Sequence, residues 1–150
     1  MKKAPYCLVK LNHVEPKDCT VIATQMCLGL SYKEAHEKMA KIGRKPNRGY
    51  RYRIAAPILG LEVRTDLVNM TVGTALKSLQ SGRFVIRVKR HVFAVVDGRM
   101  FDTVFTNTRK RVMAVYEAPM DNPVFLKRYP YLEMLARIDK LPDMRAINCH

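Results

Sequence analysis

Hydrophobic and polar positions follow two different periods along this chain, and they predict helices early and strands later. Residues 19–28 form an almost wholly apolar run that stops at Gly29, which is typical of a buried helix. The next segment, Ser31-Tyr32-Lys33-Glu34, matches a capping box, in which the first and fourth residues satisfy each other's backbone groups. It predicts a second helix that runs to about Ile42 and is ended by Gly43.

Apolar runs in the second half of the chain predict four strands, over residues 83–88, 91–96, 99–104 and 112–116. Asp97-Gly98 separates the second and third runs and is a strong hairpin signal, because both turn positions favour a positive φ. Weaker signals predict a short strand or an extended arm at 5–14, a strand at 61–64, a helical or irregular segment at 54–59, and a short helix at 72–79. The pattern therefore predicts an α+β fold, with helices packed on an antiparallel sheet.

Composition changes after Ala118, where prolines become frequent. The one convincing element beyond that point is a helix over about residues 130–140, which carries one apolar face. We therefore expect a main domain over residues 1–118 and a C-terminal helical extension over residues 119–150.

The charge of the chain favours anionic partners such as nucleic acid or an acidic protein surface. Lysine and arginine number 27 against 13 acidic residues, for a net charge of +14. Short basic clusters lie at 87–90 and 109–111, and the longest basic stretch is 44–53. That stretch is either a solvated loop or an anion-binding site. Its candidate binding residues are Arg44, Lys45, Arg48, Arg51 and Arg53.

The cysteines show no spacing typical of a metal site or a disulfide framework. They stand at positions 7, 19, 27 and 149, with no CxxC pair. Free thiols in a reducing cytoplasm are the simplest interpretation, and no metal or cofactor is predicted. No apolar stretch approaches the roughly 18 residues that a membrane span needs, and no signal peptide is evident, so we expect a cytoplasmic protein without a membrane partner.

The predicted hairpin brings a histidine and a carboxylate together. A two-residue loop at Asp97-Gly98 pairs Val96 with Arg99, and alternation then places His91 and Asp102 on one face as diagonal neighbours. Backbones in such positions lie roughly 7–8 Å apart, which these side chains can bridge. An imidazole held by a carboxylate keeps one tautomer and is stabilised when protonated. This pair is a candidate general base.

Cys19 supplies a candidate nucleophile. It stands directly before the apolar helical run, and a helix N-terminus stabilises negative charge, which favours a thiolate. Asp18 opposes this effect unless its side chain turns away to cap the helix. Cysteine, histidine and aspartate are the three groups that thiol-based acyl transfer requires, so we expect Cys19, His91 and Asp102 to converge.

Four segments carry a resemblance to a known family: 18–23, 29–32, 82–88 and 91–103. Over about residues 12–105 the chain is similar to small papain-like cysteine peptidase domains of bacteriophage and bacterial proteins, related to the bacteriocin-processing peptidases. The resemblance implies a papain-like fold with Cys19 as nucleophile, His91 as general base and acid, and Asp102 as the orienting group. The glutamine that the family places before its cysteine is absent here. The polar oxyanion candidates are Asn12 and His13, beside the backbone N–H of Cys19.

The sequence therefore predicts peptide or isopeptide hydrolysis by a Cys-His-Asp triad on a peptide or protein substrate. The resemblance places such a phage-encoded protein in the host cytoplasm or the virion. Acyl transfer as in transglutaminases or arylamine acetyltransferases uses the same groups and stays open. The alternative is a weak or inactive peptidase-like scaffold that acts as a basic binding or virion structural protein. A further alternative is nucleic-acid binding through residues 44–53. The sequence does not indicate an oligomeric state.

Overall fold

The computed structural model describes residues 6–11, 17–46, 48–104, 106–119 and 144–149. The helices within these ranges are α1 (Cys19–Leu28), α2 (Tyr32–Ile42), α3 (Tyr52–Ile58) and α4 (Val72–Leu76). The strands are β1 (Tyr6–Leu11), β2 (Glu62–Arg64), β3 (Arg83–Val88), β4 (His91–Val96), β5 (Arg99–Asp102), β6 (Ala114–Glu117) and β7 (Met144–Cys149). The predicted α+β class is confirmed.

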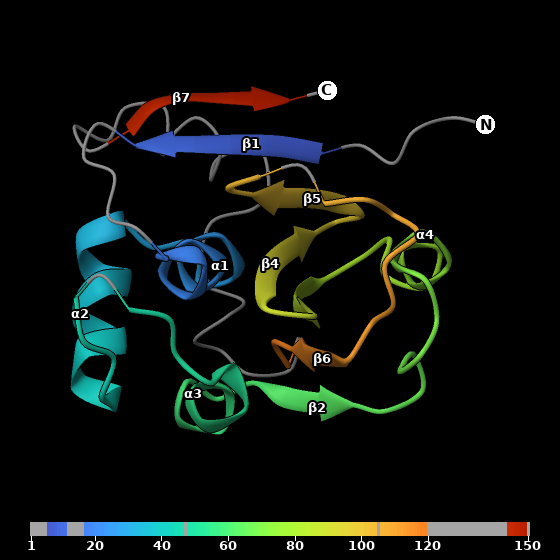
Figure 1. Cartoon of the computed structure of the whole chain (residues 1–150), viewed down its shortest axis with the longest axis horizontal. Helices are drawn as coiled ribbons and strands as arrows, with labels where there is room; N and C mark the ends of the chain where they lie inside the picture. Colours follow the sequence, from blue (N-terminus) through green and yellow to red (C-terminus); the bar gives the residue numbers. More distant parts are fainter. Residues whose placement is uncertain (1–5, 12–16, 47, 105, 120–143, 150) are drawn as a thin grey trace.

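The strands form one sheet in the order β2-β6-β3-β4-β5-β1-β7 (Figure 1). Neighbouring strands are antiparallel except for β1 and β5, which run parallel, so the sheet is not purely antiparallel as expected. Strand β7 was not predicted, and it joins the same sheet as the strands before residue 118 by pairing with β1. The helix predicted over residues 130–140 lies outside the described residues.

Helices cover both faces of the sheet. Figure 1 shows α1, α2 and α3 on one side of the strands and α4 on the other. Two cores result, and alternation along β4 divides its side chains between them. Val92 and Ala94 pack in the core that contains α1, whereas Phe93 and Val95 pack in the core that contains α4. Helix α1 is buried along its whole length after its first residue, which makes it a rigid support.

Local signals in the sequence set the end of α1 and the starts of α2 and α4, whereas α4 ends at Leu76, three residues before its predicted end. Ser31 Oγ accepts the N–H of Glu34 at 3.1 Å, while Glu34 Oε1 accepts the N–H of Ser31 at 3.4 Å, which completes the capping box of α2. Gly29 ends α1 with φ 67°, a left-handed conformation that glycine adopts at little cost. Thr71 Oγ1 accepts the N–H of Thr74 at 3.2 Å and caps α4.

The β4–β5 hairpin has the predicted register. Val96 pairs with Arg99, and the turn residues Asp97 and Gly98 have φ of 48° and 81°. Strand β5 ends at Asp102 instead of continuing to Val104, because the Asp102 carboxylate accepts the backbone N–H groups that would extend the ladder.

Strand β6 begins at Ala114, two residues later than predicted. The cause is Val112, whose N–H donates to the carbonyl of Met70 and whose carbonyl accepts from the N–H of Asn69, each at 2.8 Å. Val112 is therefore paired with the loop before α4 and not with the sheet.

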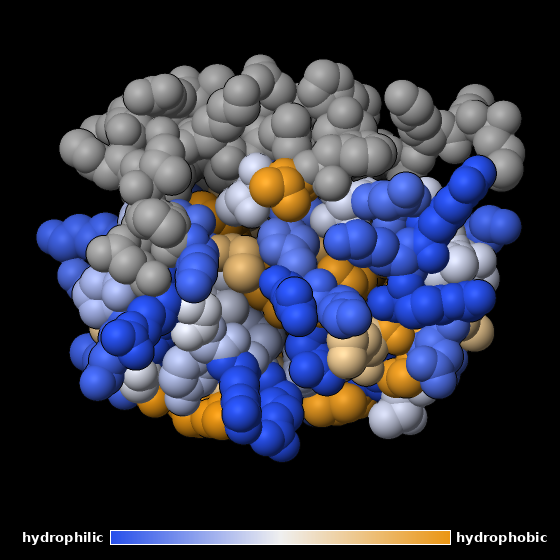
Figure 2. All heavy atoms as spheres, viewed as in Figure 1, coloured by the Kyte–Doolittle hydropathy of each residue, from blue (hydrophilic) through white to orange (hydrophobic). Residues whose placement is uncertain are grey.

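The surface of the described residues is largely hydrophilic in the view of Figure 2, with single hydrophobic side chains between the polar ones. No helix in the described ranges combines the length and the apolar character needed to cross a membrane.

We predict that Gly98→Ala lowers the free energy of unfolding by about 1–2 kcal/mol in urea denaturation, because a side chain at a left-handed position is strained. The new Cβ would also lie 2.8 Å from Gln80 Oε1, and the Gln80 side chain is held by its donation to the carbonyl of Leu76 at 2.7 Å. Gly49→Ala is the matched control, since its Cβ meets nothing within 4 Å. Equal stabilities for the two variants would contradict the role of the turn.

Candidate active site

Cys19 is the first residue of α1, as its position before the apolar run predicted. The helix begins where the N–H of Ile22 donates to the carbonyl of Asp18 at 3.0 Å. The Cys19 side chain is half-buried, while the residues of α1 that follow it are buried in the core. The hydrophobic core therefore fixes the helix, and its thiol-bearing end stays accessible.

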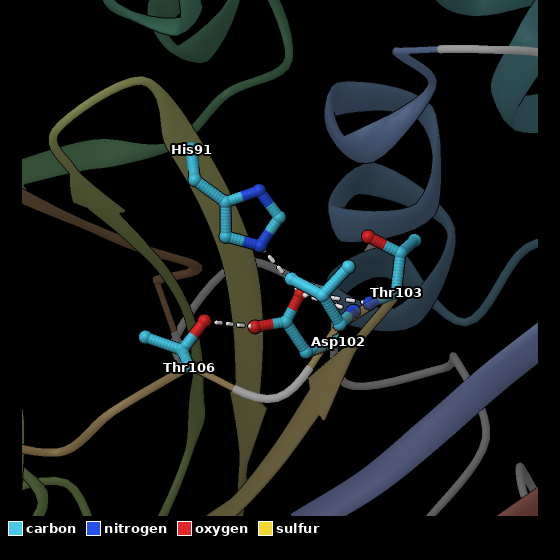
Figure 3. A network of polar contacts seen from close by, with 5 residues as sticks. His91, Asp102, Thr103 and Thr106 are labelled. Carbon is cyan, nitrogen blue, oxygen red and sulfur yellow. Dashed lines mark hydrogen bonds and ion pairs between the residues drawn. The ribbon is translucent and has the colours of Figure 1, made fainter.

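His91 and Asp102 are in direct contact, as the hairpin register predicted. His91 Nε2 donates to Asp102 Oδ1 at 2.5 Å, and Figure 3 shows the ring pointing toward the carboxylate. The His91 ring also stacks on Phe93, with ring centroids 6.2 Å apart. The imidazole is therefore held both by its nitrogen and by its face.

Asp102 is a buried carboxylate with an unusually complete set of donors. Besides His91, its Oδ1 accepts the N–H of Thr103 at 2.7 Å and that of Val104 at 3.4 Å. Its Oδ2 accepts the hydroxyl of Thr106 (Figure 3). Only 2% of the Asp102 surface is exposed, so these bonds compensate for the loss of water around the charge. Thr106 was not foreseen, because a threonine four residues along a loop gives no periodic signal.

Cys19 lies close enough to His91 to act on the imidazole, and both residues line one cavity. Burial alone would lower the pKa of His91, but its interactions with Asp102 and Cys19 outweigh burial and raise the pKa from 6.5 to about 9. The site therefore favours a protonated imidazole between two groups that can carry negative charge.

Asp18 does not cap α1 through its side chain, contrary to one possibility raised by the sequence. Its carboxylate turns instead toward Tyr32, whose hydroxyl donates to Asp18 Oδ2 at 3.3 Å. Asp18 is buried beside the nucleophile candidate, and this bond from α2 satisfies part of its hydrogen-bonding capacity.

The basic loop of residues 44–53 only partly matches the expected anion-binding set. Arg44 is 3% exposed, and its Nη2 donates to the carbonyl of Lys17 at 3.5 Å. The expectation for Arg44 was therefore wrong, because its guanidinium supports the segment before Cys19 and does not face solvent. The remaining candidates are exposed: Lys45, Arg48, Arg51 and Arg53.

Cys19 and His91 line one cavity of about 390 Å³, together with Tyr50 and Arg87. Thr20 lines the same cavity, and its buried hydroxyl has no hydrogen-bond partner among the described residues. A second cavity of about 840 Å³ also has His91 in its wall. The oxyanion candidates Asn12 and His13 lie outside the described residues.

Cys27 contrasts with Cys19. It is wholly buried in α1, and burial raises the pKa of its thiol to about 12, partly offset by the charge of Arg83. Within the described ranges, no three histidine, cysteine or acidic side chains are grouped so that they could hold a metal ion.

Comparison of the chain with models of protein families, with curated proteins and with solved structures found no match. The resemblance to papain-like peptidases therefore stays an expectation from the sequence.

We predict that protein stability falls as the pH rises from about 6.5 through about 9. The pKa of His91 is raised in the folded state, so its stabilising contribution is complete below 6.5 and is lost as the folded protein releases the proton near 9. Asp102→Asn removes the carboxylate that holds the proton, and its urea-denaturation stability should depend less on pH in this window. Asp66→Asn, an exposed acid outside the site, should leave the slope unchanged. Parallel curves for the wild type and Asp102→Asn would contradict this assignment.

Proposed function

We propose that the protein is a cysteine-dependent acyl-transfer enzyme that hydrolyses peptide or isopeptide bonds through Cys19, His91 and Asp102. One observation carries the proposal: Cys19 and His91 line the same cavity wall, and the buried carboxylate of Asp102 holds the imidazole through Nε2. This is the chain of contacts that an activated thiol requires.

The chemistry follows from the order of these contacts. The Cys19 thiolate attacks the carbonyl carbon and forms a carbon–sulfur bond, while the carbonyl oxygen takes the electron pair of the π bond. Collapse of this intermediate expels the amine, which receives its proton from the His91 imidazolium, and leaves a thioester on Cys19. Neutral His91 then takes a proton from water, which attacks the thioester. Collapse of the second intermediate breaks the carbon–sulfur bond and releases the acid, while the proton from water stays on His91 beside the restored thiolate.

Stabilisation of the oxyanion would come from donors near Cys19. As the first residue of α1, Cys19 has a backbone N–H with no acceptor within the helix. The buried Thr20 hydroxyl is a second candidate, since it lines the same cavity and lacks a partner among the described residues. Donors of this kind act where charge develops in the transition state, which is where they have most effect on the rate.

The architecture supports a papain-like assignment within this proposal. A buried helix presents the cysteine at its N-terminus, and adjacent antiparallel strands β4 and β5 present the histidine and the aspartate, in the chain order Cys, His, Asp. The same geometry serves transfer to an amine as well as hydrolysis. We favour hydrolysis because water reaches an open cavity without a further binding site.

We predict that iodoacetamide modifies Cys19 far faster than Cys27 at about pH 6.5, measured by peptide mass spectrometry. An ordinary thiol is only about 1% ionised there, so a thiolate paired with an imidazolium reacts up to about a hundredfold faster. His91→Ala should slow the labelling of Cys19 by tenfold or more, on the order of the lost thiolate fraction. His36→Ala is the matched control on α2. Equally slow labelling in all three proteins would favour an inactive scaffold.

We predict that Cys19→Ala abolishes hydrolysis of a fluorogenic peptide library and that His91→Ala lowers kcat by about 10²–10⁴, the usual range for loss of a general base. Cys27→Ala should keep the activity, since Cys27 lies in the core away from the cavity wall. Circular dichroism establishes that each variant is folded. Turnover by folded Cys19→Ala at the wild-type rate would remove Cys19 from the mechanism.

A further inference from the structure

Basic side chains surround the candidate site. The clusters at 87–90 and 109–111 are distant in sequence, but the fold brings them to the same pair of cavities. The link runs through the segment before β6, where the N–H of Met113 donates to the carbonyl of Arg87 at 2.8 Å. The described lining residues include no aspartate or glutamate. Their cations are Arg51, Arg87, Lys89, Arg90, Lys110 and Arg111.

The two cavities meet at the candidate base. Lys89, Arg90, His91 and Met113 line both of them. Cys19 lies in the smaller cavity, and the larger one continues past His91 toward residues 104–111. A chain lying in both cavities would therefore cross the reactive groups with positive charge on either side.

Two of these arginines are placed in ways that folding alone does not explain. Arg90 occupies a turn position with φ 61°, where glycine or asparagine is the less strained choice. Arg87 has a buried Nε with no hydrogen-bond partner among the described residues, and its side chain lines the cavity of Cys19. The strained backbone of Arg90 and the unsatisfied Nε of Arg87 therefore point to a role in binding rather than in folding.

The lining also indicates the kind of anion. Val104 and Met113 are exposed hydrophobic side chains in the larger cavity, where they offer apolar contacts to a peptide. Apart from His91, whose ring already stacks on Phe93, the described lining of that cavity contains no aromatic side chain on which a nucleic-acid base could stack. In the smaller cavity Tyr52 is buried, and the Tyr50 hydroxyl is engaged with the carbonyl of Ile42 at 3.3 Å. An acidic peptide fits this surface better than a single-stranded nucleic acid.

We infer that the joined cavities bind an extended peptide carrying aspartate or glutamate on both sides of the bond that Cys19 attacks. The inference rests on the proposed function for the position of that bond, but the binding of acidic peptide does not require turnover. Arg87 would meet a carboxylate next to Cys19, and Arg90 would meet the chain where it passes His91.

The test uses full-length Cys19→Ala protein, so that no peptide is consumed. Oligo-glutamate, oligo-lysine and glycine-serine peptides of equal length, each with the same neutral dye, are compared by fluorescence anisotropy. Oligo-glutamate should bind at least about tenfold more tightly than the neutral peptide, and raising the salt concentration should weaken it, because the contacts are charge-assisted. Equal affinities for the three peptides would overturn the inference.

Arg90→Asn, in the same background, separates binding from folding. Asparagine tolerates the left-handed turn, so stability in urea should stay the same or rise, while the Kd for oligo-glutamate should increase about tenfold. Arg48→Asn is the matched control: it removes the same charge from an exposed residue that lines neither cavity. Equal losses in the two variants would show general attraction to a basic surface and would contradict a site.

A single-stranded thymidine oligonucleotide of equal charge gives the remaining comparison. Weaker binding of the oligonucleotide than of oligo-glutamate supports the peptide site, and tighter binding overturns it in favour of nucleic acid. The iodoacetamide experiment on the wild type stays independent. An activated Cys19 with no preference for acidic peptide would refute this inference alone, whereas an unreactive Cys19 would refute the proposed function.

Discussion

The burial of one carboxylate organises the site. Asp102 can be ionised inside the protein only if hydrogen bonds replace its water, and it obtains them from its own chain at Thr103, Val104 and Thr106 and from His91. Those bonds end β5 and turn the chain away from the sheet. The same charge holds the imidazole and stabilises its proton. The end of the strand, the shape of the next loop and the state of the base therefore depend on a single side chain.

The meeting of Cys19 and His91 follows from where each element starts. Alternation along β4 places His91 with Phe93, on the side of the sheet away from α1, as the two cores show for the residues that follow. His91 can still reach Cys19 because it is the first residue of β4. It lies beside the Lys89-Arg90 turn, at the end of the sheet, where a side chain is not confined to one face. Cys19 is likewise the first residue of its helix. The residues one position further into these elements, Thr20 and Val92, are already buried.

The sequence could predict the features that depend on short-range rules. The Asp97-Gly98 turn and a period of two were sufficient for the His91–Asp102 contact, and the capping box was sufficient for the start of α2. The burial of Arg44 and the gathering of two basic clusters around His91 were not predictable, because each depends on packing between distant segments. Strand β7 was missed for the same reason, since pairing with β1 decides it more than its own composition.

In the proposed mechanism, positive charge around the cavities would act on the nucleophile as well as on a substrate. Arg87 lines the cavity of Cys19, so its guanidinium would lie near the sulfur while the proposed reaction takes place. Asp18 lies next to Cys19 in the chain, and its carboxylate accepts the Tyr32 hydroxyl. An acidic substrate would bring further negative charge toward the thiolate. The excess of cations in the lining would offset the repulsion between the acidic substrate and the thiolate, so that one surface could hold both at close range. The strained position of Arg90 is understandable in these terms, since a neutral residue at this turn would relieve the backbone but remove one cation from the lining of both cavities.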